Sequence, residues 1–369
     1  MVSSVSVASG PSFAISHFRP VQWRTGRFLF RIFGAQNGYI PRVTLASVDP
    51  RSEIVDPPRI SLCFLPTPLH RLDRASEALG IDLWIKRDDM TGFALGGNKG
   101  RKLEYLMADV LASGADVVVS CGGIHSNFLR QLAAGCAKCG VACATAVMEL
   151  PYEDGPAEGR RPSAEGGNQV LDRLFGMDLR LHPDSNWDTL FAHAEDLAKS
   201  FEAEGKKVYR MPLGGSSPLG AFGFWKAAHE LPDDVEAIVF ASSSGSTHIG
   251  LATYFFGTDV AVEGMACDPE PQITEDFADL SRRLNELTGL PALKASDLRL
   301  DMSSVGAGYG LMSDEADEAV KWLARLEGIV LDPIYSGKAF GALLRRREEF
   351  AGKKTVFWHT GGVPTVFAV

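Results

Sequence analysis

The chain has 369 residues, a length that favours about two domains, and its 45% hydrophobic and 22% charged residues are ordinary for a globular protein. Its formal charge of −9 argues against nucleic acid or an acidic membrane surface as a partner. No uninterrupted apolar run approaches the ~20 residues that a membrane-spanning helix needs, so we expect no membrane partner.

The first 48 residues contain no Asp or Glu but carry Arg19, Arg24, Arg27, Arg31 and Arg42. Such a composition resembles an organelle transit peptide, which would make the protein mitochondrial. The alternatives are a disordered extension or a start codon placed upstream in error, and then we expect a cytoplasmic protein. In each case we treat residues 1–50 as an N-terminal extension outside the fold.

The first elements of the fold lead to a lysine. A helix over 73–79 ends at Gly80, and a short strand over 83–86 precedes Arg87-Asp88-Asp89, which we interpret as a charge-paired turn rather than as catalytic carboxylates. Gly96-Gly97 then leads to Lys99, where apolar residues at helical spacing predict a helix as far as Gly114. A lysine placed directly after a glycine turn can reach a buried carbonyl, as a Schiff-base lysine must.

Strands and helices alternate from there onward. Strands are predicted at 116–120, 141–148, 178–181 and 207–211, with helices at 126–137 and 187–204 between them. A further strand at 237–241 enters the small-residue loop 242–247 before another helix, and the last strand, at 355–358, ends at Thr360-Gly361-Gly362. This alternation predicts an α/β fold with doubly wound parallel sheets.

Three turns in this pattern follow predicted strands: Ser126-Asn127, the 242–247 loop, and Thr360-Gly361-Gly362. Ligands of open parallel sheets bind beyond the carboxyl ends of the strands, so we expect these turns and Lys99 to meet in one cleft. Backbone N–H groups of the 242–247 loop could bind an anion at the start of the next helix, or the loop could merely cap that helix. No dinucleotide fingerprint is present.

The run Gly97-Asn98-Lys99-x-Arg101-Lys102-Leu103-Glu104 resembles the cofactor-lysine motif of the 1-aminocyclopropane-1-carboxylate deaminase and D-cysteine desulfhydrase family. The segments 331–339 and 359–362 are similar to that family too, and the resemblance covers roughly residues 58–369. It implies a pyridoxal 5′-phosphate enzyme of fold type II, with two doubly wound parallel-sheet domains and the cofactor in the cleft between them. The larger domain would contain 51–101 and 211–369, the smaller 102–210, and the protein would form a homodimer.

The resemblance also implies roles for individual residues. Lys99 would bond covalently to the cofactor; Ser244, Gly245, Ser246 and Thr247 would hold its phosphate; Asn127 would hydrogen-bond its 3′-oxygen and Thr360 its pyridine nitrogen. Ser126 and Tyr309 would act with Lys99 in catalysis, and the substrate would contact Ser126, Asn127, His125 and Tyr309. The simpler readings are helix caps for Ser126 and Asn127, a turn residue for Thr360 and a core aromatic for Tyr309. Lys102 resembles a second lysine near the site, or else lies on the helix surface.

The sequence departs from the family near the site. His125 stands where glutamine is common, Phe128 where the deaminases carry glutamine, and Ser246 where glycine is usual. Gly308 replaces a glutamate that serves the pyridine nitrogen in the ring-opening deaminases, which points toward the desulfhydrase branch.

We therefore predict α,β-elimination from a small amino acid, with D-cysteine giving pyruvate, sulfide and ammonia as the first candidate. The alternatives are a 1-aminocyclopropane-1-carboxylate deaminase, an L-cysteate sulfo-lyase, and a pyridoxal-phosphate-binding protein without turnover. No metal site is expected, because Cys136-x-x-Cys139 lacks the second cysteine pair or the histidines of a zinc site.

Overall fold

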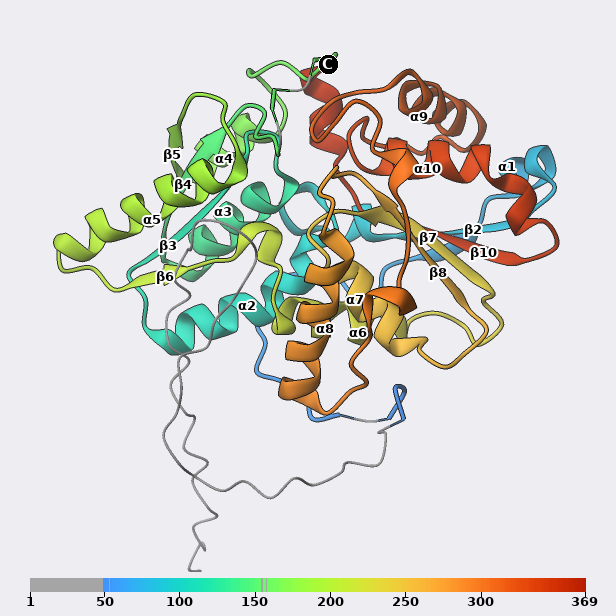
Figure 1. Ribbon diagram of the computed structural model, residues 1–369, viewed down its shortest axis with the longest axis horizontal. Helices are drawn as coiled ribbons and strands as arrows, with labels where there is room; N and C mark the ends of the chain where they lie inside the picture. Colours follow the sequence, from blue (N-terminus) through green and yellow to red (C-terminus); the bar gives the residue numbers. More distant parts are fainter. Residues whose placement is uncertain (1–48, 53, 154, 157) are drawn as a thin grey trace, which may run out of the picture.

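The computed structural model describes residues 49–369, except 53, 154 and 157. The transit-peptide prediction for residues 1–48 lies outside the described residues. The described chain forms two sheets side by side, each with helices on both faces (Figure 1).

The larger sheet has six strands in the order β1-β2-β10-β7-β8-β9. In chain order these are β1 (Leu69–Arg71), β2 (Asp82–Arg87), β7 (Ala237–Ser242), β8 (Ala261–Ala266), β9 (Arg299–Asp301) and β10 (Lys354–His359). All neighbours pair in parallel except the edge strand β1, which runs antiparallel to β2. Along β10, Val356 and Trp358 enter one hydrophobic core and Phe357 enters the other, as alternation requires for a strand buried on both faces.

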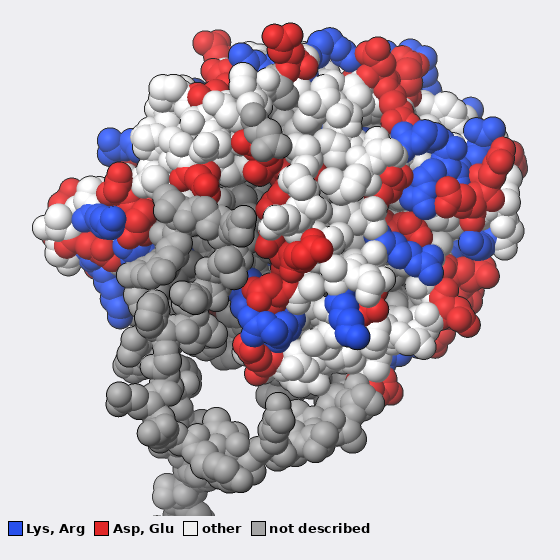
Figure 2. Space-filling model, in the orientation of Figure 1, with Lys and Arg blue, Asp and Glu red and all other residues white. Residues whose placement is uncertain are grey.

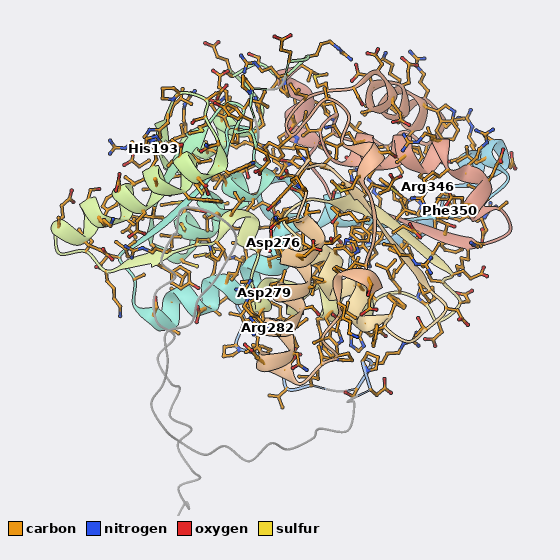
Figure 3. The ribbon with its side chains drawn as sticks, viewed as in Figure 1. His193, Asp276, Asp279, Arg282, Arg346 and Phe350 are labelled. Carbon is orange, nitrogen blue, oxygen red and sulfur yellow. The ribbon has the colours of Figure 1, made fainter. Side chains whose placement is uncertain are left out.

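Two helical layers cover this sheet. The core that contains Phe357 packs against α1 (Asp73–Leu79), α9 (Asp314–Glu327) and α10 (Ser336–Arg345). The core that contains Val356 packs against α6 (Pro218–Ala228), α7 (Ser246–Tyr254) and α8 (Ile273–Thr288). Helix α8 lies outermost, and its polar side carries Asp279 and Arg282, an ion pair of 2.6 Å (Figure 3).

The smaller sheet has four parallel strands in the order β5-β4-β3-β6. These are β3 (Val117–Gly123), β4 (Ala142–Met148), β5 (Asp178–Leu181) and β6 (Val208–Arg210). Helix α5 (Trp187–Ala203) covers one face, while α3 (Asn127–Cys139) and α4 (Asn168–Leu174) lie on the other side.

Helix α2 (Lys99–Ser113) connects the two sheets. Tyr105 packs edge-on to Phe222 of α6 in a core of the larger sheet, whereas Leu103 and Leu106 belong to the core under the smaller sheet. The predicted doubly wound α/β fold is confirmed, with β1 as an antiparallel exception. The domain boundaries at 101/102 and 210/211 stay a prediction.

Within the described residues no helix is both long and apolar enough to cross a membrane. On the face drawn in Figure 2, acidic and basic side chains are interspersed, without a large area of one sign.

Candidate active site

Lys99 opens α2 at the end of a tight backbone turn. Its part-buried amine donates a hydrogen bond of 2.7 Å to Asn98 Oδ1. Burial lowers the pKa of Lys99 to about 8, and the negative charge of Asp332 opposes part of that shift. More of these amines than of ordinary lysines are therefore neutral near physiological pH, and a nucleophilic amine must be neutral.

Asn98 joins three of the predicted site elements. Its side chain accepts from Lys99 and donates 3.2 Å to Thr247 Oγ1 at the start of α7. Its backbone N–H donates 3.0 Å to the carbonyl oxygen of Thr360. The backbones are in close contact here, because a Cβ added to Gly361 would lie 2.5 Å from Gly97 Cα. The predicted meeting of Lys99 with the turns after β7 and β10 is what the structure shows.

The turn after β7 presents unpartnered donors. Gly245, at φ 92°, precedes α7 without a side-chain cap, so the first N–H groups of the helix point into the site. Ser246 is fully buried, and its hydroxyl has no hydrogen-bond partner among the described residues. Ser244 lies against Gly214, where an added Cβ would come within 2.5 Å of the Ser244 hydroxyl oxygen. These features suit a bound anion better than a simple helix cap.

Lys102 is one helical turn after Lys99 and is buried, not on the helix surface. Its amine donates 3.2 Å to the carbonyl oxygen of Gly214, beside Ser244, and lies 5.8 Å from the centre of the Phe224 ring. Burial, and then the neighbouring Lys99, lowers the pKa of Lys102 well below its usual range.

The start of α3 carries two more of the predicted site residues, Ser126 and Asn127. Ser126 caps the helix, since its Oγ accepts from the backbone N–H of Leu129 at 3.3 Å. The buried Asn127 accepts at Oδ1 from Asn168 at 3.0 Å, which leaves its N–H donors for another partner. Asn168 also donates 2.7 Å to the carbonyl oxygen of His125. The cap interpretation of Ser126 is thus correct, and its hydroxyl proton remains available.

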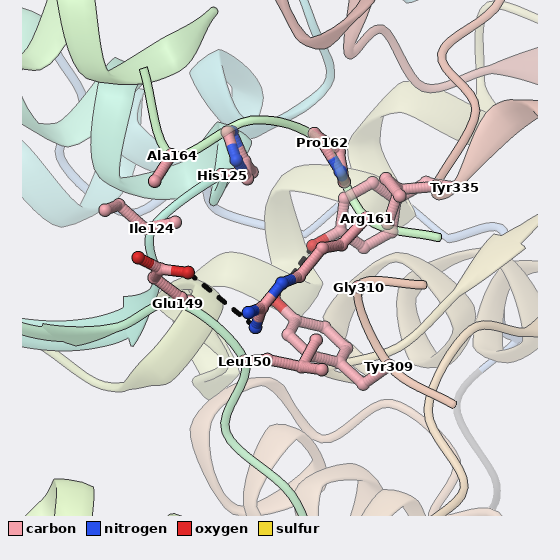
Figure 4. Close-up of a pocket in the computed structure, with 12 residues that line it drawn as sticks. Ile124, His125, Glu149, Leu150, Arg161, Pro162, Ala164, Tyr309, Gly310 and Tyr335 are labelled. Atoms are coloured by element: carbon pink, nitrogen blue, oxygen red, sulfur yellow. Dashed lines mark hydrogen bonds and ion pairs between the residues drawn. The ribbon is translucent and has the colours of Figure 1, made fainter. Parts of the chain in front are cut away.

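A pocket opens between the residues just before α3 and the two segments 309–310 and 334–335 (Figure 4). It is lined by His125, Tyr309 and Tyr335, and the two tyrosine hydroxyls are 2.9 Å apart. Neither ring nitrogen of His125 reaches a hydrogen-bond partner of good geometry in the part of the chain that the structure describes. Burial lowers the pKa of that ring, while the backbone at 162–163 opposes the shift. Burial raises the pKa of both tyrosines, so their hydroxyls stay protonated.

Arg161 lines this pocket, and Lys338 supports the turn that carries Tyr309. The Arg161 guanidinium lies 3.7 Å from the Glu149 carboxylate (Figure 4) and 3.3 Å from that of Asp184. Lys338, nearly fully buried, donates 2.6 and 2.9 Å to the carbonyl oxygens of Val305 and Gly308, in the turn before Tyr309.

The Arg87-Asp88-Asp89 turn is charge-paired, as predicted. Asp88 is buried and accepts two hydrogen bonds of 2.8 Å from Arg101, and Asp89 pairs with Arg87 at 2.7 Å. The carbonyl oxygen of Asp88 also accepts 2.8 Å from the N–H of Gly97. This turn therefore supports the lysine loop.

Three residues with clear positions in the site are absent from the predicted set: Asn98, Tyr335 and Arg161. Asn98 and Tyr335 lie inside the motifs that carry the family resemblance, so that signal was present in the sequence. Arg161 lies in a Pro- and Gly-rich stretch with no motif, and only the folded chain brings it to the pocket.

A profile of the family described as pyridoxal-phosphate dependent enzyme matches residues 60–361. The chain is 38% identical over 327 residues to a D-cysteine desulfhydrase of Salmonella paratyphi B, which covers 84% of this chain and 96% of that protein. The D-cysteine desulfhydrase of Salmonella newport matches with the same identity and coverage.

Solved structures agree with these relatives. A crystal structure described as an ACC deaminase homologue has a TM-score of 0.74 at 33% identity, over 84% of this chain and 94% of that one. The processed form of threonine deaminase isoform 2 from Solanum lycopersicum has a TM-score of 0.55 at 16% identity, over 86% and 94%, and shares the fold.

The residues around Lys99 fit pyridoxal phosphate. An amine of lowered pKa suits the aldehyde carbon, and the uncapped start of α7 with the orphan Ser246 hydroxyl suits the phosphate. Asn98 connects these two places through hydrogen bonds of 2.7 and 3.2 Å.

Proposed function

We propose that this chain, which belongs to the family of pyridoxal-phosphate dependent enzymes, catalyses α,β-elimination on a small amino acid. D-Cysteine is the first candidate substrate, because relatives named D-cysteine desulfhydrase are 38% identical over 327 residues. D-Cysteine and one water would give pyruvate, sulfide and ammonia. The observation that carries the proposal is the Lys99 amine, with its pKa near 8, joined through Asn98 to the uncapped end of α7.

Bound pyridoxal phosphate supplies an electron sink for the charge that develops when the α-proton leaves. In the proposal Lys99 holds the cofactor, and its free amine then removes the α-proton. Ser244, Gly245, Ser246 and Thr247 hold the phosphate through the start of α7. Asn127 and Thr360 orient the ring, because each lies at the carboxyl end of a strand that faces the cleft.

The substrate would lie between α3 and the paired tyrosines. The start of α3, with Ser126, suits the substrate carboxylate, since helix N-termini favour anions. Tyr309 and Tyr335 share a hydrogen bond of 2.9 Å, and the hydroxyl that accepts in this pair keeps its own proton to donate to a departing thiolate. His125 contributes part of the pocket wall, and burial, which lowers the pKa of its ring, favours the uncharged form.

The proposal is tested by product release from the purified, cofactor-loaded chain. Pyruvate would be measured with D-cysteine, L-cysteine, L-cysteate and β-chloro-D-alanine, and 2-oxobutyrate with 1-aminocyclopropane-1-carboxylate. We expect turnover of D-cysteine and chloroalanine that Lys99→Ala abolishes, and that a control at the exposed Lys206, Lys206→Ala, leaves unchanged. The absence of products from the whole panel with the cofactor bound would contradict the proposal and favour a binding protein without turnover.

A deaminase acting on the cyclopropane is the second candidate, because the solved structure at 33% identity is described as an ACC deaminase homologue. Residue 308 argues against it: glycine offers no carboxylate there, and its carbonyl oxygen is occupied by Lys338. Preference for the cyclopropane over D-cysteine would reverse this order.

We also propose a homodimer in the cytoplasm; the mitochondrial alternative depended on residues 1–48, which lie outside the described residues. The dimer proposal is supported by three exposed apolar side chains near the lysine loop, Phe64, Met90 and Leu95, at 78%, 50% and 66% exposure. The N–H of Phe64 donates 2.9 Å to the carbonyl oxygen of Thr91, and its ring lies over Gly92. We call these three side chains the apolar patch.

A further inference from the structure

The loop that leads to Lys99 has an unusual backbone. Ala94, at φ 50°, and Leu95, at φ 63°, are the non-glycine residues with positive φ in the described part of the chain. Gly96 and Gly97 continue with φ of 79° and 119°, so four successive residues before Asn98 adopt conformations that favour glycine. Side chains at such φ values are strained, and the conformation persists only where the surroundings fix it.

The Leu95 side chain does not supply that fixation, because it is 66% exposed. The Asp88 carbonyl holds the N–H of Gly97, and side chains of α3 hold the carbonyl oxygens of the residues before it. Arg130, fully buried, donates 2.7 Å to the carbonyl oxygen of Ala94 and 2.9 Å to that of Gly96. The two bonds span the strained pair of residues, and a guanidinium is the side chain whose fixed fork can make both at once.

The next residue of α3 strengthens the contact. Gln131 donates 3.2 Å to the same Gly96 carbonyl and lies close to Gly97, where an added Cβ would meet its amide nitrogen at 2.6 Å. Arg130 itself lies one turn after Ser126, and its N–H donates 3.3 Å to the Ser126 carbonyl oxygen. The residues just before α3, up to His125, thus line the pocket, while Arg130 and Gln131 of α3 hold the lysine loop.

We propose that Arg130 is a positioning residue: it holds the strained turn 94–97 and thereby fixes the Lys99 amine relative to Ser126 and Asn127. This inference rests on the proposed role of Lys99 as the cofactor lysine. Arg130 touches neither cofactor nor substrate in this scheme. Its contribution is to keep the backbone before Lys99 in one conformation.

The test compares Arg130→Met, Leu95→Gly and the double variant in the full chain. Cofactor affinity would be measured by titration of the apoprotein with pyridoxal phosphate, and attachment at Lys99 by borohydride reduction and peptide mass spectrometry. We expect Arg130→Met to weaken affinity at least tenfold and to lower labelling at Lys99. Leu95→Gly removes the positive-φ penalty, so the double variant should regain at least half of the lost affinity on a logarithmic scale.

The matched control is Arg210→Met. Arg210 is also a buried arginine, on the smaller sheet, but it pairs with Glu195 and Glu202 far from the loop in the chain. We expect its variant to lower the melting temperature without changing the cofactor affinity. A purely structural role for Arg130 would make the two arginine variants behave alike and would leave no rescue by Leu95→Gly.

Affinity of Arg130→Met within twofold of the parent, or a loss that Leu95→Gly does not relieve, overturns the inference. If Arg130→Met does not fold, Arg130→Lys replaces it, because lysine keeps the positive charge but cannot donate to two carbonyl oxygens with a planar guanidinium. A cofactor affinity of Arg130→Lys equal to that of the parent would also overturn the inference. Absence of Lys99 labelling in the parent would instead refute the proposed function itself. Normal labelling in every variant would refute only the role of Arg130.

Discussion

At the scale of single residues, the site depends on polar groups whose partners are few. Asn98 hydrogen-bonds through its backbone N–H and both ends of its side-chain amide to Thr360, Thr247 and Lys99. These bonds hold the starts of α7 and α2 and the turn after β10 in fixed positions relative to one another. In contrast, the Lys99 amine makes one hydrogen bond and the Ser246 hydroxyl makes none to the described residues. Both can therefore form further hydrogen bonds to a ligand. A buried hydrogen-bonding group without a partner destabilises the free protein. A ligand that supplies the partner removes that cost and so binds more tightly.

The pKa of Lys99 leads to a prediction about its reactivity. Burial lowers this pKa to about 8, with Asp332, Cys267, Arg130 and Asp88 as the charged or titratable neighbours. At pH 7 about one amine in ten would then be neutral, far more than for an ordinary lysine. We expect labelling of Lys99 in the apoprotein by an amine-selective reagent to rise with pH with a midpoint near 8, as followed by peptide mass spectrometry.

The lowered pKa of Lys99 also determines how the stability of the apoprotein changes with pH. The unfolded chain binds more protons at Lys99 between pH 8 and its ordinary pKa, so this group makes the apoprotein more stable as pH rises through that interval. An exposed lysine such as Lys206 serves as the internal control for labelling. A common midpoint for the two lysines would contradict the prediction.

A substitution of Ser246 should change the stability of the apoprotein and its affinity for the cofactor in opposite directions. A buried hydroxyl without a partner costs about 1–3 kcal/mol, so Ser246→Ala should stabilise the apoprotein by about 1 kcal/mol. The same change removes a donor to the phosphate and should weaken pyridoxal phosphate binding about tenfold, or about 1.4 kcal/mol. Pyridoxal, which lacks the phosphate, should bind as before. Denaturant unfolding and ligand titration measure the two effects.

Ser242→Ala is the control for this prediction, because the Ser242 hydroxyl is satisfied by His248 Nδ1 at 3.1 Å. It should lower stability and leave the cofactor affinity unchanged. A Ser246→Ala protein that loses stability while binding pyridoxal phosphate normally would show that the hydroxyl has a partner within the fold.

At the scale of elements, residues 158–167 tie the two sheets together over the pocket. Arg160 pairs with Asp314 and Asp317 of α9 at 2.9 and 2.7 Å, on the side of the larger sheet. The adjacent Arg161 pairs instead with Glu149 and Asp184, which follow strands of the smaller sheet. The two neighbouring arginines thus pair with opposite sides of the molecule, Arg160 with a helix of the larger sheet and Arg161 with loops of the smaller sheet. Of the two, Arg161 lines the pocket.

This difference predicts unequal effects for equal substitutions. Exposed ion pairs contribute about 0–1 kcal/mol, so neither arginine should matter much for stability. Arg161→Gln removes part of the pocket wall and should raise KM for the substrate about threefold to tenfold, or about 1 kcal/mol, with little change in kcat. Arg160→Gln should leave KM unchanged. Steady-state kinetics check both, and equal changes in the two variants would mean that the segment acts as a whole and not through Arg161.

Most elements of this fold could be predicted from the sequence, and the exceptions have local causes. The predicted helix over 187–204 corresponds to α5 (Trp187–Ala203), and the strand over 178–181 coincides with β5. Strands β1 and β9 have three residues each, too few for an alternation of period two to appear, whereas β6, equally short, is predicted within 207–211 by its place in the alternation of strands and helices. Helix α10 escapes prediction because Gly337 and Gly341 lower its propensity, although both pack closely against their neighbours.

The same distinction holds within the site. Lys99, Ser126 and the serine loop carry local signals, namely glycine turns and positions at the ends of strands. Asn98 and Arg130 act through residues 149 and 36 positions away, and nothing in their own surroundings in the sequence indicates those partners. Tertiary contacts of this kind become visible only in the folded chain.

At the scale of the whole molecule, α2 belongs to the cores of both sheets while carrying Lys99 at its first position. The carboxyl ends of the strands in both sheets face the same cleft, so the lysine lies at the boundary between two bodies. Contacts between such bodies usually permit some relative motion. Arg130 and the 158–167 segment are the connections that would limit it near the site.

The apolar patch leads to the prediction at this scale. Phe64, Met90 and Leu95 are exposed on the outside of the loop whose inner side reaches Lys99. Exposure of three large apolar side chains to water is unfavourable. A second copy of the chain that covered them would gain about 25 cal/mol of binding free energy per Å² of apolar area buried. A stable interface buries about 1,200–2,000 Å² in total, so the patch would form its centre rather than its whole extent.

We therefore expect light scattering to give the mass of two chains for the parent and of one chain for Phe64→Asp. Val55→Asp is the matched control, because Val55 is 92% exposed and lies outside the patch. It should leave the mass at two chains. Since the patch adjoins the lysine loop, separation of the chains should also weaken pyridoxal phosphate binding, by removing support from the outer side of residues 90–95. A parent of one chain, or a Phe64→Asp protein of two, would place the contact elsewhere or exclude it. The loop would then depend for its conformation on contacts within one chain, from Arg130 and Gln131 on one side and from Asp88 on the other.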